Sequence, residues 1–262
     1  MTNNLHISMI QTCITWENRD RNLEHFGHLI GKADKETNLI VLPETFTTGF
    51  SMNVQALADT MDGPTVATLK TWAQTYQTAI TGSFIAREED RYYNRAFFIT
   101  PEGQAAYYDK RHLFRMSGEN KHFTPGGRPL IVNYRGWNIC LQVCYDLRFP
   151  VWSRNAGKAY DLLIYVANWP EARIKAWDVL LPARAVENLS YVCGVNRTGM
   201  DGERNSYNGH SAVYSPKGDR IADAGATPED IHTCILQKDE LDRLRAKFPA
   251  WMDADPFIIP LA

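Results

Sequence analysis

The sequence has 262 residues, of which 44% are hydrophobic and 22% charged, and its formal net charge is −2. This composition is typical of a folded globular protein and excludes a disordered or disulfide-rich chain, and the lack of a basic excess argues against a nucleic-acid partner. No apolar run reaches the about 18 residues of a membrane span, and the first residues lack a signal segment, so we expect a cytoplasmic protein that does not bind membranes.

Apolar runs rich in Val, Ile, Tyr and Phe predict strands along the whole chain. Helical spacing of apolar residues follows the first strand and Pro64, and it recurs at 173–189 and 238–247. The order strand, helix, strand, helix, strand predicts parallel crossover units, and turns at 101–103 and 216–218 predict antiparallel hairpins. We therefore expect an α/β fold with mixed sheets and a single domain over residues 1–262. The predicted strands are 5–9, 38–42, 79–86, 95–100, 137–143, 162–167, 191–196 and 232–236.

The segment 112–128 lacks clear periodicity and contains three glycines, so we predict a long and functionally important loop there. The five cysteines contain no Cys-x-x-Cys pair, and the seven histidines are scattered. Disulfides, structural zinc and a catalytic metal are therefore not expected. Four of the cysteines lie in or beside apolar runs and are expected in the core. These are Cys13, Cys140, Cys193 and Cys234.

Cys144 differs from the other cysteines because it stands where a strand pattern ends and a predicted helix opens at Pro150. Such a turn exposes a nucleophile and directs free backbone N–H groups toward negative charge. A buried structural thiol remains an equally good interpretation of Cys144 taken alone.

Glu44 and Lys110 also follow predicted strands, at 38–42 and 105–109. Taken singly, Glu44 would be a helix cap or surface charge, and a lysine at a strand end is nearly always solvated. Together with Cys144 they form a complete set for attack on an amide carbonyl: a general base, a cation for the oxyanion and a thiol nucleophile.

Three segments carry these residues, and in order and spacing they resemble the three motifs of the nitrilase superfamily of carbon–nitrogen hydrolases. The segments are 42–44 (LPE), 108–114 (YDKRHLF) and 144–150 (CYDLRFP), with further likeness at 183–188 (ARAVEN) and 208–211 (NGHS). The resemblance implies a four-layer α-β-β-α sandwich that assembles into homodimers or larger homo-oligomers, and it implies no cofactor.

The resemblance also implies a role for each site residue. Cys144 is the nucleophile, Glu44 the general base, and Lys110 stabilises the tetrahedral intermediate with the backbone N–H of Tyr145. Glu119 matches the second glutamate of the family, which orients the lysine; an exposed loop carboxylate is the alternative. The implied reaction passes through a thioester that water cleaves.

Within the superfamily, segments 43–50 and 109–116 look most like the omega-amidases, which hydrolyse the terminal amide of 2-oxoglutaramate and related small amides. A free carboxylate on the substrate needs a cation, and Arg115, Arg148 or Arg173 could supply it, although Arg148 could equally fix its own loop. Aromatic side chains are expected to wall the pocket, with core packing as the alternative. These are Phe46, Tyr145 and Trp169.

Three alternatives remain open at the level of sequence. Another carbon–nitrogen hydrolase, such as an N-carbamoyl amidase or a nitrilase, would differ only in its pocket. A non-enzymatic interaction protein could keep the fold without turnover. A papain-like hydrolase would need a histidine beside Cys144, and His210 could serve only if folding brought the two together.

Overall fold

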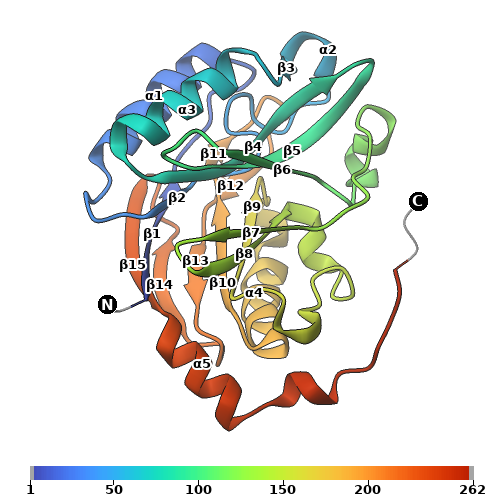
Figure 1. The fold of residues 1–262 in the computed structure, drawn as a ribbon. Coiled ribbons are helices and arrows are strands. Elements are labelled where there is room, and N and C mark those ends of the chain that lie inside the picture. Colours follow the sequence, from blue (N-terminus) through green and yellow to red (C-terminus); the bar gives the residue numbers. More distant parts are fainter. Residues whose placement is uncertain (1–2, 260–262) are drawn as a thin grey trace.

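The computed structural model describes residues 3–259 and contains two mixed β-sheets (Figure 1). In the first sheet, β1 (Asn4–Gln11), β2 (Leu39–Val41) and β4 (Ala79–Glu88) are parallel. The strand order is β15-β1-β2-β4-β5-β6, and the short β3 pairs with β4. The helices α1 (Arg19–Lys32) and α3 (Pro64–Tyr76) connect the parallel strands, which confirms the predicted crossovers. The remaining elements of this half are α2 (Val54–Leu57), β3 (Asp59–Thr60), β5 (Arg91–Ile99), β6 (Ala105–Asp109) and β15 (Asp230–Gln237).

The second sheet has the order β14-β13-β10-β9-β8-β7, with parallel pairing among β8, β9 and β10. The helix α4 (Ile174–Asn188) joins β9 to β10 through a crossover, and α5 (Lys238–Lys247) follows β15. A small hairpin, β11–β12, stands apart from both sheets. The strands are β7 (Leu130–Tyr134), β8 (Trp137–Val143), β9 (Leu162–Ala167), β10 (Tyr191–Asn196), β11 (Thr198–Met200), β12 (Ser206–Asn208), β13 (Ser211–Tyr214) and β14 (Arg220–Gly225).

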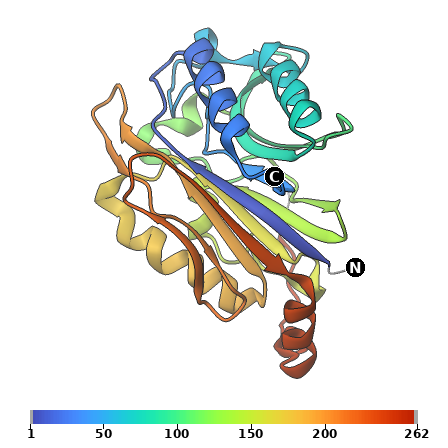
Figure 2. The same ribbon diagram turned by 90° about the vertical axis from the view of Figure 1, so that its left-hand side faces the viewer.

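The core lies in three layers of apolar contacts. Strand residues of both sheets, such as Ile7 and Ile164, form one cluster between the sheets. A second cluster packs α1 and α3 on the outer face of the first sheet, and a third packs α4 on the outer face of the second. Figure 2 shows these helices on the two outer sides of the paired sheets. The four-layer α-β-β-α sandwich is therefore confirmed.

The segment after Cys144 differs from the prediction. A 3₁₀ helix, η3 (Cys144–Arg148), replaces the helix expected to open at Pro150, and turns follow it. The side chains of Trp152 and Ser153 turn inward to hydrogen-bond Tyr108 and Gln142, which stops a regular helix from forming. The prediction of a helix at Pro150 was wrong because tertiary hydrogen bonds outweigh the local pattern.

Three further predictions from the sequence can be compared with the structure. The long loop at 112–128 is present and holds two 3₁₀ turns, η1 (Arg115–Ser117) and η2 (Glu119–Lys121). Cys13 was expected in the core but is exposed, because it lies beyond the end of β1. The single domain over 1–262 stays a prediction, and its residues 1–2 and 260–262 lie outside the described range. Within residues 3–259, every helix is too short or too polar to cross a membrane.

Close packing between α4 and β10 depends on Gly194. A Cβ at this position would lie 2.5 Å from Leu181 Cδ1 and 2.8 Å from Trp177 Cζ2, both of which belong to α4. Leu181 itself is fully buried against the second sheet. The helix therefore sits as near to the sheet as the backbone allows.

We expect Leu181→Ala to lower the free energy of unfolding by about 2–5 kcal/mol, because it leaves a cavity that the close-packed layer cannot fill. Urea unfolding measures the change. Lys175→Ala on the exposed side of the same helix is the control and should alter stability little. Equal losses in the two variants would contradict this account of the interface.

Candidate active site

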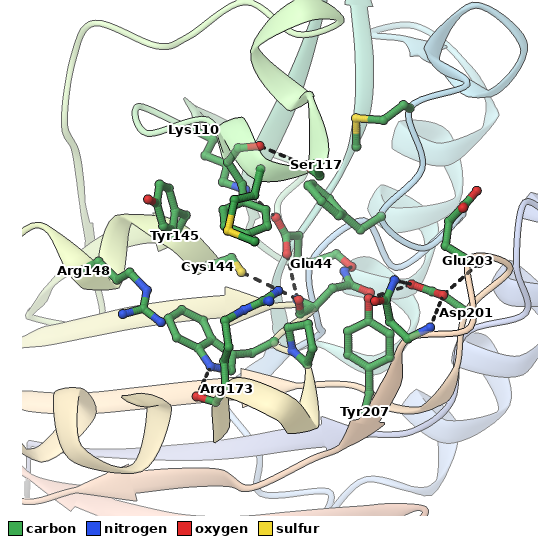
Figure 3. A pocket seen from close by; sticks show the side chains of 18 of the residues that line it. Glu44, Lys110, Ser117, Cys144, Tyr145, Arg148, Arg173, Asp201, Glu203 and Tyr207 are labelled. Atoms are coloured by element: carbon green, nitrogen blue, oxygen red, sulfur yellow. Dashed lines mark hydrogen bonds and ion pairs between the residues drawn. The ribbon is translucent and has the colours of Figure 1, made fainter. Parts of the chain in front are cut away.

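Glu44, Lys110 and Cys144 meet although 100 residues of chain separate the first from the last (Figure 3). Glu44 follows β2, Lys110 follows β6 directly, and Cys144 begins η3 at the end of β8. The first two positions belong to one sheet and the third to the other. The site therefore lies where strand ends of both sheets converge.

The ammonium of Lys110 is held between two carboxylates. Its Nζ donates to Glu44 Oε1 at 3.0 Å and to both oxygens of Glu119 at 3.0 and 3.1 Å. Burial disfavours the charged form, but the negative charges of Glu119 and Glu44 outweigh this effect and hold the pKa of Lys110 above its ordinary value. The lysine therefore stays protonated.

Glu44 accepts hydrogen bonds from both halves of the molecule. Its Oε1 also accepts from Asn94 Nδ2 at 2.7 Å, and its Oε2 accepts from the backbone N–H of Asn168 at 2.7 Å. Asn168 follows β9, and its side chain donates to the backbone carbonyl of Glu44. These bonds fix the carboxylate relative to the second sheet, which carries Cys144.

Glu119 lies in η2, inside the long loop, and is fully buried rather than exposed. Its Oε2 accepts from the backbone N–H of Phe114, which fixes the loop onto the cluster. Burial raises the pKa of Glu119 above its ordinary value. The positive charge of Lys110 lowers this pKa in part, and the negative charge of Glu44 raises it further. One buried ammonium group, that of Lys110, thus donates hydrogen bonds to two carboxyl groups.

Cys144 has a left-handed backbone, with φ of 44°. This conformation is uncommon for a residue with a side chain, and such strain is frequent at functional sites. The thiol lies 3.9 Å from the carbonyl oxygen of Asn168. Burial and the charge of Glu44 raise the pKa of the Cys144 thiol well above its ordinary value. At neutral pH the sulfur is a thiol, and its activation requires a nearby base.

The turn that presents Cys144 is fixed by the buried Asp146. Its Oδ2 accepts from the backbone N–H of Val143 at 3.0 Å and from the hydroxyl of Tyr108 at 2.8 Å. Its Oδ1 accepts from the backbone N–H of His112 at 3.0 Å. One carboxylate thereby connects η3 to the segment that carries Lys110.

A cavity of about 480 Å³ opens above these groups. Arg148 lies over the ring of Trp169 at 5.0 Å, and Arg173 lies over the ring of Phe114 at 5.1 Å. Within residues 3–259, neither arginine forms an ion pair with a carboxylate. In Figure 3 the Arg148 guanidinium lies to the left of Cys144 and the Arg173 guanidinium lies below it. The pocket therefore offers positive charge beside the thiol.

Most of the pocket residues predicted from sequence line this cavity, but two candidates do not. Tyr145, Trp169, Arg148 and Arg173 all line it. Phe46 was expected there, but its ring is fully buried between Phe26 and Phe97 in the cluster below the helices. Arg115 is exposed and lies outside the pocket lining. The aromatic wall next to Glu44 is instead Phe50, whose ring lies 5.0 Å from Lys110 Nζ.

Sequence analysis missed three polar residues of the site. Asn94 and Asn168 hold Glu44, and Tyr207 lines the pocket with its hydroxyl bonded to Asp201. Asn168 directly follows a buried apolar strand, the same signal that pointed to Glu44. Asn94 sits within a strand, where polar side chains are common and carry no such signal.

His210 lies away from the thiol. Its Nδ1 is 3.1 Å from Asp178 of α4, and it is not among the residues that line the pocket. The papain-like interpretation needed this histidine beside Cys144. The position of His210 removes the basis of that alternative.

Comparison with known proteins gives concordant findings. The family model described as carbon–nitrogen hydrolase matches residues 6–246. The chain is 44% identical to the omega-amidase YafV of Escherichia coli K12, covering 97% of this chain and 98% of that protein. It is 32% identical to the 2-oxoglutaramate amidase of Bacillus subtilis 168, covering 94% and 96%.

The fold agrees with these relatives. The structure is similar to that of a CN-hydrolase superfamily protein from Xanthomonas campestris that carries an arsenic adduct in its active site. The TM-score is 0.96 and the identity 42%, over 98% of this chain and 99% of that one.

We expect Lys110→Met to lower the free energy of unfolding by about 3–5 kcal/mol at neutral pH, because two buried carboxylates lose their cation. The loss should be smaller at pH 5 than at pH 8. Since the pKa of Glu119 is already raised by burial, a proton can bind between the carboxyl groups at low pH, and the stability it gives is lost as pH rises.

Urea unfolding at the two pH values measures this difference. Adding Glu119→Gln to Lys110→Met should recover part of the loss at pH 8, because one buried charge is removed. An equal loss at both pH values would show that the ammonium does not serve to neutralise the pair.

Proposed function

The chain belongs to the carbon–nitrogen hydrolase family, and from that premise we propose that it is an omega-amidase. It hydrolyses the terminal amide of short 2-oxo dicarboxylic acid monoamides, 2-oxoglutaramate and 2-oxosuccinamate, to the 2-oxo acid and ammonia. The observation that carries the substrate class is the pair of arginines beside Cys144, which form no ion pair with a carboxylate in the described part of the chain. The names of the two relatives above support the same substrate class.

In the proposed mechanism, Cys144 is the nucleophile and Glu44 the general base. Glu44 takes the thiol proton as the sulfur attacks the amide carbon, which is needed because the pKa of the Cys144 thiol is raised. The tetrahedral oxyanion receives hydrogen bonds from the ammonium of Lys110 and from the backbone N–H of Tyr145. Ammonia leaves with the proton from Glu44, and a thioester remains.

The second half of the reaction uses the same groups. Glu44 accepts a proton from a water molecule, which attacks the thioester carbon, and the proton then returns to the sulfur as the 2-oxo acid leaves. Glu119 holds Lys110 from the opposite side at 3.0 and 3.1 Å. This second carboxylate orients the ammonium and keeps it charged through both steps.

The free carboxylate of the substrate binds to Arg148 and Arg173 in this proposal. A guanidinium can donate two parallel hydrogen bonds to a carboxylate, which fixes the direction of a small substrate. Each of the two arginines rests on an aromatic ring, Trp169 or Phe114, and these rings restrict where the guanidinium can lie. The amide at the other end of the substrate then lies at Cys144.

We further propose a cytoplasmic enzyme that forms a homodimer. Five cysteines without a disulfide in the described chain are typical of a reducing compartment. The outer face of α4 exposes Val179 by 66% and Val186 by 50%, and an apolar helix face of this kind suits a second copy.

We expect the purified protein to release ammonia from 2-oxoglutaramate with kcat/KM above about 10⁴ M⁻¹s⁻¹, the usual range of enzymes on their own substrates. Cys144→Ala should abolish this activity, because Cys144 is the only cysteine among the described residues that line the pocket. Cys13→Ala changes an exposed cysteine outside the pocket and is the matched control.

Substantial ammonia release by Cys144→Ala would overturn the assignment of the nucleophile. Faster turnover of N-carbamoyl compounds or nitriles than of 2-oxoglutaramate by the unaltered protein would overturn the substrate, and it would favour one of the other carbon–nitrogen hydrolase activities.

We expect Arg148→Met and Arg173→Met each to raise KM for 2-oxoglutaramate by about tenfold or more, the cost of one hydrogen bond to a charged group. KM for an uncharged amide of similar length should change little. Arg115→Met, outside the pocket, is the control. Equal effects on charged and uncharged amides would contradict carboxylate recognition by these residues.

A further inference from the structure

Asn94 touches both carboxylates of the site although it lies outside the residues that line the pocket. It is fully buried on β5, and its Nδ2 donates to Glu44 Oε1 at 2.7 Å and to Glu119 Oε1 at 3.3 Å. Lys110 donates to the same two oxygens. The amide and the ammonium therefore share their acceptors.

A chain of hydrogen bonds fixes which way the Asn94 amide faces. The backbone N–H of Thr45 donates to Ser83 Oγ at 2.9 Å, and this bond cannot reverse because a backbone N–H only donates. The Ser83 hydroxyl directs its hydrogen to Asn94 Oδ1 at 2.9 Å. With its oxygen bound in this way, Asn94 presents its NH₂ group to the glutamates.

The need for this group follows from the position of the ammonium. Lys110 Nζ has three N–H donors, and its contacts are one with Glu44 and two with the two oxygens of Glu119, which a single N–H can share. When the ammonium turns toward an oxyanion, its bonds to these carboxylates change direction. A buried carboxylate oxygen left without a donor is costly, and Asn94 is the neutral donor placed to prevent this at both oxygens.

We propose that Asn94 is a positioning residue, oriented by Ser83 and the Thr45 N–H, that keeps Glu44 and Glu119 hydrogen-bonded and in place while Lys110 turns to the oxyanion. The charged and titratable groups that face Glu44 are Lys110 after β6, Glu119 in η2, Cys144 in η3 and Tyr207 on β12. Asn94 differs from these four because it donates without a charge that changes with pH.

Two variants and a matched control test the proposal. Asn94→Leu is nearly isosteric and removes the donor, and Asn94→Ser keeps a small polar group near Ser83 but is too short to reach Glu44. Thr81→Val is the control, since it loses one buried hydrogen bond of the same sheet, to the Phe97 carbonyl at 2.7 Å, without contact to either glutamate. Circular dichroism and urea unfolding establish that each variant is folded.

The expected kinetic result is a fall in kcat of about tenfold or more with KM for 2-oxoglutaramate little changed, because Asn94 does not touch the substrate. The acidic limb of the kcat/KM profile should move to higher pH by about one unit in both Asn94 variants. The shift arises because the buried carboxylate pair loses a neutral donor that favours its charged state over its protonated state. Thr81→Val should leave the limb where it is.

The activity measurement rests on the proposed function, so a second measurement does without a substrate. Iodoacetamide alkylates Cys144 only when a nearby base accepts the thiol proton, and mass spectrometry of the Cys144 peptide follows this reaction against pH. Its acidic limb should move upward in the Asn94 variants by the same amount. If the unaltered protein released no ammonia, the amidase assignment would fail while this measurement still tested Asn94.

If the acidic limbs of the kcat/KM and alkylation profiles stayed at the same pH in the folded Asn94 variants, the proposal would be overturned. Asn94 would then have a packing role only. The same shift in Thr81→Val would also overturn it, because any lost hydrogen bond in the sheet would then have the same effect.

Discussion

The buried ammonium of Lys110 is the constraint on which the site depends. A charge without water is tolerated only when opposite charges and hydrogen bonds surround it, and Lys110 finds both in Glu44 and Glu119. Meeting this requirement brings together the ends of β2 and β6 and the loop turn η2. Glu44 then reaches the second sheet through Asn168. Glu44 therefore both binds the lysine and joins the two sheets near the point where Cys144 emerges.

Much of this arrangement is predictable from sequence, because a strand is visible as a short apolar run and several site residues follow such a run. The runs before Glu44, Lys110 and Cys144 predicted β2, β6 and β8, and the alternation of strands and helices predicted the parallel crossover units. Lys110 taken alone would have been assigned to solvent. Only its combination with a carboxylate and a thiol, and the likeness of all three segments to one family, indicated a buried role.

The features of the site that the sequence did not predict depend on backbone turns and on hydrogen bonds between residues far apart in the chain, which no local sequence pattern indicates. Phe46 and Phe50 both follow Glu44, but each comes directly after a residue with a left-handed backbone, Thr45 with φ of 42° and Gly49 with φ of 74°. One ring therefore enters the core and the other the pocket. The helix predicted at Pro150 fails for a similar reason, since Trp152 finds its partner Tyr108, 44 residues away. The role of Asn94 depends on its contacts with Glu44 and Glu119, which lie 50 and 25 residues away in the sequence.

The pairing of β1 with β15 bears on how the protein is made in the cell. Eight residue pairs join these strands, from Asn4 with Gln237 to Gln11 with Asp230, so the first sheet is incomplete until residues 230–237 have left the ribosome. The charge cluster, by contrast, lies entirely within the first 121 residues, and the thiol is translated after it. A nascent chain therefore carries these charges before β8 and the thiol of Cys144 have been made, and the first sheet stays incomplete until β15 follows.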